Sequence, residues 1–327
     1  MSNKPADALQ KFSDYMPLGK TDIVVSVLGL GTWQWGDRMF WGYGKTHNDQ
    51  DIQDAFHASL EAGVNFFDTA EVYGVGRSEQ YLGRFVRALP DSMRKNLVIA
   101  TKFFPMPYRL WKFQFRWALR GSLRRLGLKQ VDLYQIHSPY AIRSIEIWVD
   151  GLADALEAGL IKAAGVSNYD VDQTRRAWTV LKSRGFPLAS NQVEYSLLNR
   201  NVEKQGLLAL CQELAITLIA YSPLAKGILT GKYNPENPPP GFRRGIYDQT
   251  LLRKTQPLIQ LMREIGEGHG GKTPAQVALN WTICKGAVAI PGAKNKRQAI
   301  ENAQALGWRL TPEEVAALDK ASDEVLA

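Results

Sequence analysis

The stretch EAGVNFFDTAEVYG, residues 61–74, places a carboxylate and a phenol after a short apolar run. Residues 64–67 follow a glycine and are mostly apolar or aromatic, which is typical of a short buried strand. Asp68 then stands at the carboxyl end of this strand, and Tyr73 follows in the next loop. The stretch predicts a carboxylate and a proton donor at one rim of the fold, although an ordinary strand ending in a polar turn would have the same pattern.

Comparable apolar runs recur along the chain and alternate with stretches of helical periodicity, such as residues 49–62. Asn48 or Asp49 is the expected N-cap of that helix, and Ser78 is the expected N-cap of a second one. The expected strands are residues 64–67, 97–101, 131–136, 162–166, 188–193, 217–220 and 287–290, together with a first strand that follows a hairpin within residues 16–31. Such uniformly apolar runs are typical of parallel strands covered on both faces.

The expected strands end repeatedly in polar side chains at their carboxyl ends. These residues are Asp68, Lys102, His137, Asn168, Gln192 and Ser222. In a (β/α)8 barrel the carboxyl ends of all strands surround one site. A doubly wound sheet is the alternative, but no G-x-G-x-x-G sequence opens a helix after the first strand. We therefore predict an α/β fold, a (β/α)8 TIM barrel with an N-terminal β-hairpin and long loops on its carboxyl-end face.

Length and composition agree with one such barrel. The chain has 327 residues, which one domain over residues 1–327 can accommodate, with residues 1–15 as a flexible or loosely packed segment. The hydrophobic fraction of 45% is sufficient for a large core. No signal-peptide pattern is visible, and no run approaches the roughly 20 apolar residues of a membrane span. We therefore expect a cytoplasmic protein without a membrane partner.

The chain is basic, with a formal net charge of +8 from 40 Lys and Arg residues against 32 Asp and Glu residues. This charge favours anionic partners. The cations are scattered rather than gathered in one tract, which argues against nucleic acid and favours a phosphorylated small molecule. The sequence does not specify an oligomeric state, and we expect a monomer.

Several motifs follow one another in order: GLGTWQWG (29–36), EAGVNFFDTAEVYG (61–74), ATK (100–102), DLYQIH (132–137), GVSN (165–168), NQVEYS (191–196), YSPLAKGILTGKY (221–233) and IPGAKNKRQAIEN (290–302). From about Pro17 to the last helix they resemble the aldo-keto reductase family. The resemblance implies an NADP-dependent oxidoreductase of the alcohol dehydrogenase type, which reduces aldehydes or ketones to alcohols with NADPH. A nucleotide-binding regulatory barrel with little catalysis is the alternative, because fold alone does not separate the two.

The resemblance implies a catalytic tetrad of Asp68, Tyr73, Lys102 and His137. Carbonyl reduction needs a proton at the oxygen, and we expect Tyr73 to supply it as general acid. Free tyrosine has a pKa of about 10, but an ammonium at roughly 4 Å would stabilise its phenolate by about 4 kcal/mol at an effective dielectric constant near 20. We therefore expect Lys102 to lower the pKa of Tyr73 and Asp68 to keep Lys102 charged, while His137 orients the carbonyl oxygen.

The resemblance also implies which residues hold NADPH. Polar residues after two strands suit the nicotinamide carboxamide, Tyr221 offers a ring for stacking, and residues 222–227 offer backbone N–H groups for the pyrophosphate. The best-known branch of the family has Lys-Ser directly after Ile-Pro, whereas Gly-Ala-Lys follows here, so we expect Lys294 to contact the 2′-phosphate. The expected cofactor contacts are Gly31, Thr32, Trp33, Asp68, Ser167, Asn168, Gln192, Tyr221, Ser222, Pro223, Leu224, Lys226, Gly227, Lys232, Gly292, Lys294, Gln298, Glu301 and Asn302.

Aromatic residues after the first and third strands predict an apolar pocket for a small carbonyl substrate. These residues are Trp33, Trp35, Phe103, Tyr108 and Trp111. A metal-dependent hydrolase is disfavoured, because of the four histidines, His47, His57, His137 and His269, only His137 ends an expected strand. We therefore predict no metal site.

Overall fold

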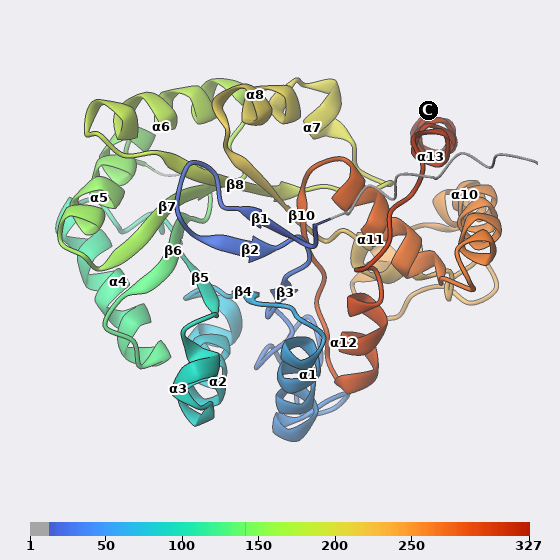
Figure 1. Cartoon of the computed structure of the whole chain (residues 1–327), viewed down its shortest axis with the longest axis horizontal. Helices are drawn as coiled ribbons and strands as arrows, with labels where there is room; N and C mark the ends of the chain where they lie inside the picture. The colour runs from blue at the N-terminus through green and yellow to red at the C-terminus, as the bar shows by residue number, and fades with distance from the viewer. Residues whose placement is uncertain (1–12, 141) are drawn as a thin grey trace, which may run out of the picture.

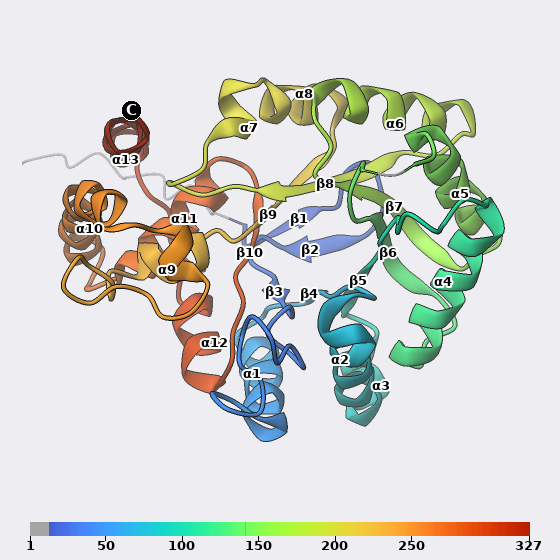
Figure 2. The same ribbon diagram turned by 180° about the vertical axis from the view of Figure 1, so that it is seen from behind.

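An eight-stranded parallel sheet forms the centre of the computed structural model, which describes residues 13–140 and 142–327. Its strands follow one another in chain order from β3 to β10. Parallel bridges from Leu28 to Ala289 and from Gly31 to Gly292 bring the first strand beside the last, so the sheet closes into a barrel. Helices surround this barrel (Figure 1), and the ring is also visible from behind (Figure 2). The predicted (β/α)8 fold is confirmed.

The barrel strands are β3 (Leu30–Gly31), β4 (Phe66–Asp68), β5 (Val98–Phe103), β6 (Val131–Ile136), β7 (Ile161–Ser167), β8 (Leu188–Glu194), β9 (Thr217–Tyr221) and β10 (Val288–Ile290). The second of them begins later than predicted, because Asn65 binds another segment. Its Oδ1 accepts a hydrogen bond from the backbone N–H of Ser26 at 2.7 Å, and its Nδ2 donates to the carbonyl of Val24 at 2.9 Å. Asn65 therefore anchors the N-terminal hairpin instead of extending β4.

The α-helices are α1 (Asp49–Glu61), α2 (Arg77–Ala88), α3 (Asp91–Arg94), α4 (Lys112–Leu126), α5 (Ile145–Glu157), α6 (Val171–Ser183), α7 (Asn201–Lys204), α8 (Leu207–Leu214), α9 (Arg243–Ile246), α10 (Gln249–Gly268), α11 (Pro274–Cys284), α12 (Lys296–Ala303) and α13 (Pro312–Leu326). Asn48 caps α1, as predicted. Ser78 is not a cap, since α2 starts after Gly76 and the Ser78 hydroxyl donates to the carbonyl of Thr32 at 2.9 Å. This bond ties α2 to the end of β3.

The hairpin closes the amino end of the barrel. Its strands β1 (Tyr15–Pro17) and β2 (Val24–Ser26) form a separate antiparallel sheet, which lies across the barrel in Figure 1. Leu18 and Val25 are fully buried in the same apolar cluster as the inward side chains of the barrel strands, such as Leu133. Burial of these side chains excludes water from that end. An accessible site is therefore expected at the carboxyl end.

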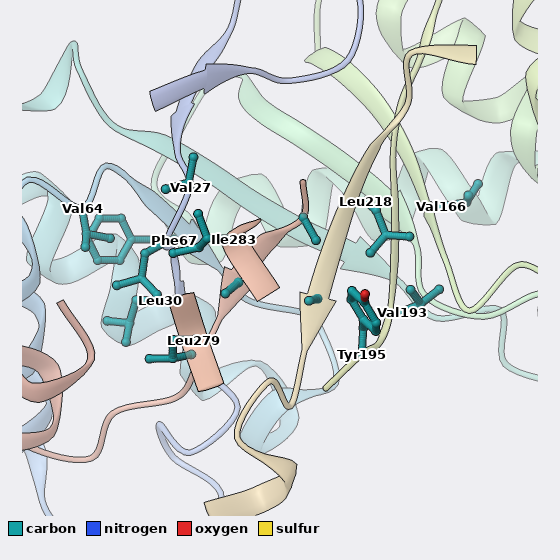
Figure 3. Packing of buried hydrophobic residues seen from close by; sticks show 14 of the residues in the cluster. Val27, Leu30, Val64, Phe67, Val166, Val193, Tyr195, Leu218, Leu279 and Ile283 are labelled. Atoms are coloured by element: carbon teal, nitrogen blue, oxygen red, sulfur yellow. The ribbon is translucent and has the colours of Figure 1, made fainter. Parts of the chain in front are cut away.

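A second apolar layer lies between the strands and the helices. Figure 3 shows part of it, with Leu30, Phe67 and Leu218 contributed by the strand side and Leu279 and Ile283 by α11. These side chains are at most 7% exposed. Packing on both faces of the sheet explains why the strand sequences are apolar throughout.

Of the N-terminal segment predicted to be flexible, residues 1–12 lie outside the described residues. Residues 13–15, the described part of this segment, contact the rest of the chain. Tyr15 belongs to β1, and the Asp14 carboxylate accepts hydrogen bonds from Arg309 and from the backbone N–H of Gly307, each at 2.9 Å. Within residues 13–140 and 142–327, no helix is both long and apolar enough to cross a membrane.

Candidate active site

A cavity of about 710 Å³ opens at the carboxyl ends of the barrel strands. Every residue expected from the sequence to contact the cofactor lines this cavity, from Gly31 in β3 to Asn302 in α12. Asp68, Tyr73 and His137 line it as well, whereas Lys102 lies behind its wall with no exposed surface. The structure thus brings the predicted site residues together, and their individual roles stay predictions.

Within the predicted tetrad, Lys102 connects Asp68 to Tyr73. Its Nζ donates to Asp68 Oδ2 at 2.5 Å, to the carbonyl of Thr69 at 2.9 Å and to Tyr73 Oη at 3.3 Å. Three acceptors match the three N–H bonds of an ammonium group. Burial lowers the pKa of Lys102, and the charge of Asp68 opposes this effect. Asp68 therefore opposes the loss of the Lys102 proton, and its role in catalysis stays a prediction.

The Asp68 carboxylate is fully satisfied inside the barrel. Besides Lys102, its Oδ1 accepts hydrogen bonds from Gln192 Nε2 at 2.9 Å and from Gln135 Nε2 at 3.2 Å. Gln192 thus supports Asp68 while also lining the cavity, and Gln135 is a member of the site that sequence reasoning missed.

The pKa of Tyr73 differs from the sequence-based prediction. Burial raises it well above the usual value, and the negative charge of Asp68 raises it further. The prediction of a lowered pKa considered Lys102 alone, whereas Asp68 cancels much of the lysine field at the phenol oxygen. Tyr73 is consequently a neutral phenol near pH 7, in the protonation state that a proton donor requires.

His137 is held against the phenol by packing. The rings of Tyr73 and His137 stand edge-on with centroids 5.7 Å apart, and the ring of Phe104 contacts His137 at 5.5 Å. Burial lowers the pKa of His137 well below its usual value, and the nearby charge of Lys102 lowers it further. The imidazole is therefore neutral, and its Nδ1 has no hydrogen-bond partner among the described residues.

Three polar residues at the carboxyl ends of β7 and β9 form a connected group on the cavity wall. Asn168 has a left-handed φ of 63°, and its Nδ2 donates to the carbonyl of His137 at 3.0 Å. Its Oδ1 accepts from the hydroxyl of Tyr221 at 3.0 Å, and the Ser167 hydroxyl donates to the carbonyl of Gln192 at 2.8 Å. This bonding fixes Asn168 and Tyr221 relative to each other before any ligand enters.

The loop after β9 adopts an unusual backbone conformation. Ser222, Ala225, Lys226 and Gly227 have φ values of 50°, 46°, 53° and 100°. Three of these residues are not glycine, so the conformation is sterically unfavourable and must be held by its surroundings. Turns with left-handed residues can point successive N–H groups at an anion. Lys226 itself binds Glu194 at 2.6 Å, so its charge is already neutralised.

A cluster of cations lines the other end of the cavity. Lys294 Nζ donates to the carbonyl of Trp41 at 2.8 Å, and the guanidinium of Arg243 lies 5.3 Å from the centre of the Tyr233 ring. Burial, together with the charges of Arg243 and Lys232, lowers the pKa of Lys294 to about 8. None of the three cations forms a salt bridge within the described part of the chain. Such a cluster is suited to an anionic ligand, and Arg243 was not predicted from the sequence.

The predicted substrate residues separate into three groups. Trp33 lines the cavity and stacks on Tyr73 with ring centroids 6.2 Å apart. Trp35 and Phe103 are fully buried in the outer apolar layer, so their prediction as pocket residues is wrong. Tyr108 and Trp111 do not line the cavity and are 67% and 60% exposed. Trp41, which the sequence analysis did not select, lines the cavity instead.

The described residues contain no group of three or more His, Cys, Asp or Glu side chains that could hold a metal ion. Of the four histidines, His137 lines the cavity. His47 is buried, and its Nε2 lies 2.9 Å from the carbonyl oxygen of Gln34. His269 binds Glu314 at 2.8 Å.

Comparison with known proteins places these observations in a family. The sequence matches the model of the Aldo/keto reductase family over residues 27–323. It is similar to the protein named "Pyridoxal reductase, chloroplastic" of Arabidopsis thaliana, with 44% identity over 310 residues, which covers 92% of this chain and 84% of the relative.

Solved structures show the same similarity. The glycerol dehydrogenase of Gluconobacter oxydans superimposes with a TM-score of 0.83 at 29% identity, covering 94% of each chain. An aldo/keto reductase of Klebsiella pneumoniae, solved in complex with NADP and acetate, superimposes with a TM-score of 0.70 at 29% identity, covering 91% of each chain. The chain therefore belongs to the aldo-keto reductase family of oxidoreductases, as its motifs predicted.

Proposed function

We propose that this protein reduces aldehydes and ketones to alcohols with NADPH, and that Tyr73 is the general acid. The observation that carries the proposal is the chain of contacts from Asp68 through Lys102 to Tyr73, which ends at the cavity wall beside His137. A neutral phenol backed by a buried ammonium is suited to protonate an oxygen on which negative charge develops.

The side chains have distinct tasks in this reaction. NADPH supplies the hydride when bound. Tyr73 holds the proton that the substrate oxygen receives, and Lys102 stabilises the Tyr73 oxygen as that proton leaves. A neutral His137 can donate a hydrogen bond to the substrate oxygen without adding a competing positive charge. Asp68 keeps Lys102 protonated throughout.

Two features of the cavity fit NADPH. Residues 222–227 combine left-handed backbone geometry with a position on the cavity wall, which suits the pyrophosphate. Lys232, Arg243 and Lys294 form a cation cluster that lowers the pKa of Lys294, so an added anion would relieve their mutual repulsion. The 2′-phosphate of NADPH is an anion that NADH lacks.

We propose pyridoxal as the first carbonyl substrate to test. The Arabidopsis relative carries the name of a pyridoxal reductase. The site supports a small planar aldehyde, because Trp33 lines the cavity beside the proton donor Tyr73. A heteroaromatic ring can stack against the indole of Trp33 while its aldehyde oxygen reaches Tyr73.

A substrate panel with both reduced nicotinamide cofactors tests the proposed function. We expect pyridoxal and other aromatic aldehydes to be reduced with kcat of about 1 s⁻¹ or more, the ordinary range for enzymes. Absorbance of NADPH at its near-ultraviolet band reports the turnover. Tight NADPH binding without turnover of any carbonyl would instead favour the regulatory nucleotide-binding barrel.

Lys294→Met is expected to raise KM for NADPH about tenfold or more and to leave KM for NADH nearly unchanged, because one charge-assisted phosphate contact is lost. The wild-type KM for NADPH should also rise with pH above about 8. Lys294 has a depressed pKa near 8 in the free protein, so it carries its charge below that pH and loses it above. Initial-rate kinetics at several pH values measure both effects.

Lys296→Met is the matched control, since Lys296 begins α12 two residues after Lys294 but does not line the cavity. We expect it to alter neither KM. Equal changes for the two cofactors in Lys294→Met, or a pH dependence that persists in this variant, would show that Lys294 does not bind the 2′-phosphate.

A further inference from the structure

A buried ion pair joins the segment that carries Tyr73 to the loop after β5. Glu71 lies two residues before Tyr73, Arg109 lies before α4, and each of the paired side chains is only 9% exposed. The Arg109 guanidinium contacts both carboxylate oxygens, with Nη1 donating to Oε1 and Nη2 to Oε2, the latter at 3.0 Å. Burial alone would lower the pKa of Arg109, but Glu71 outweighs burial and raises it. The two residues therefore form a bidentate ion pair.

The same two side chains hold Phe104. Its backbone N–H donates to Glu71 Oε1 at 2.7 Å, and its carbonyl accepts from Arg109 Nη1 at 2.7 Å. The ring of Phe104 in turn contacts His137, which also contacts Tyr73. Because His137 Nδ1 has no partner among the described residues, packing rather than hydrogen bonding orients this side of the imidazole.

The turn after Tyr73 is conformationally strained. Gly74, Val75 and Gly76 have φ values of 55°, 58° and 83°. The left-handed region is unfavourable for a β-branched residue, and the Val75 side chain is 89% exposed, so its own packing cannot compensate. Contacts elsewhere must hold the turn, and Glu71 provides one immediately before it.

We propose that Glu71 and Arg109 are positioning residues that fix Tyr73 and His137 relative to each other. Neither residue lines the cavity, so neither is placed to touch substrate or cofactor. Glu71 acts on Tyr73 through the short backbone segment that joins them. Both residues of the pair act on His137 through Phe104. The inference rests on the proposed reductase function, because Tyr73 is its proton donor.

Three variants test the pair. Glu71→Gln keeps the size of the side chain and removes its charge. Arg109→Met removes the guanidinium, whereas Arg109→Lys keeps a cation but cannot form the bidentate contact. We expect kcat to fall about 10- to 100-fold in the first two variants, since displacements on the order of 1 Å at a reacting group can cost about 10²-fold. Arg109→Lys should recover part of this loss. KM for NADPH should change less than about twofold, because the cofactor contacts lie elsewhere.

Arg200→Met is the matched control for a buried ion pair. Arg200 and Arg109 are each 8% exposed, and Arg200 contacts both oxygens of Glu203 at 3.0 and 2.7 Å without lining the cavity. This control should lower the melting temperature but leave kcat per folded molecule unchanged. The proposal is overturned if Arg109→Met and Glu71→Gln also keep the wild-type kcat per folded molecule.

Nuclear magnetic resonance of the His137 ring provides a readout that does not need turnover. We expect Glu71→Gln to shift the His137 ring signals and Arg200→Met to leave them in place. This result would support the positioning role even if the wild-type protein reduced no carbonyl, in which case the proposed function alone would fail. Unchanged His137 signals in Glu71→Gln would overturn the positioning role whatever the activity.

Discussion

Tyr73→Phe is expected to lower kcat for carbonyl reduction by at least about 10²-fold, the usual loss when a general acid is removed. The substitution deletes one hydroxyl and keeps the ring that stacks on Trp33 and contacts His137. Steady-state turnover with saturating NADPH and aldehyde measures the effect. The free-energy loss corresponds to about 2.7 kcal/mol, at 1.36 kcal/mol for each tenfold change.

Cofactor binding is the control for Tyr73→Phe. Fluorescence titration should give a Kd for NADPH within about twofold of wild type, because the cation cluster and residues 222–227 are untouched. Trp33→Phe is a companion variant that keeps the phenol but changes its neighbour, and it should reduce kcat far less. A Tyr73→Phe enzyme that retained more than about a tenth of wild-type kcat would remove Tyr73 as the main acid.

The barrel and its cavity were predictable because both follow from short-range patterns. Each strand is an apolar run with a polar residue near its carboxyl end, and barrel geometry gathers these ends regardless of loop conformation. Asp68, His137 and Asn168 consequently line one cavity although they are far apart in the chain.

Two errors in the site could have been avoided from the sequence. Successive residues of a strand point to opposite faces, so an inward Lys102 requires an outward Phe103. Phe103 indeed packs against Phe115 of α4, with ring centroids 4.8 Å apart. The same alternation places Gln135, two residues before His137, on the inner face with Lys102, its partner in the β5–β6 register.

Other features depend on tertiary structure that no local pattern encodes. Arg243 reaches the rings of Trp41 and Tyr233 only because the segment between β9 and α10 folds back over the cavity. The high pKa of Tyr73 depends on burial of its phenol group and on the charge of Asp68. If only the charge of Lys102 is considered, the pKa of Tyr73 is expected to fall, because the desolvation of the phenolate is left out.

Lys102→Met is expected to lower kcat for carbonyl reduction by about 10²-fold, because the Tyr73 oxygen loses the cation that stabilises it as the proton leaves. In the reverse direction, alcohol oxidation needs the Tyr73 phenolate, so its rate rises with pH as the phenol ionises. Removal of the adjacent ammonium should move this rise to higher pH. Rates of NADP reduction across a pH series measure the shift.

The double variant Asp68→Asn/Lys102→Met separates this chemical effect from a folding defect. Lys102→Met alone leaves the Asp68 carboxylate buried beside two glutamine amides without a cation, and loss of one partner of a buried ion pair costs about 3–5 kcal/mol of stability. Removing both charges should restore much of the melting temperature but not the rate, because the phenol still lacks its ammonium. If the double variant regained wild-type kcat with an unshifted pH profile, Lys102 would be a structural residue that only offsets the charge of Asp68, and Tyr73 would transfer its proton without help from the lysine.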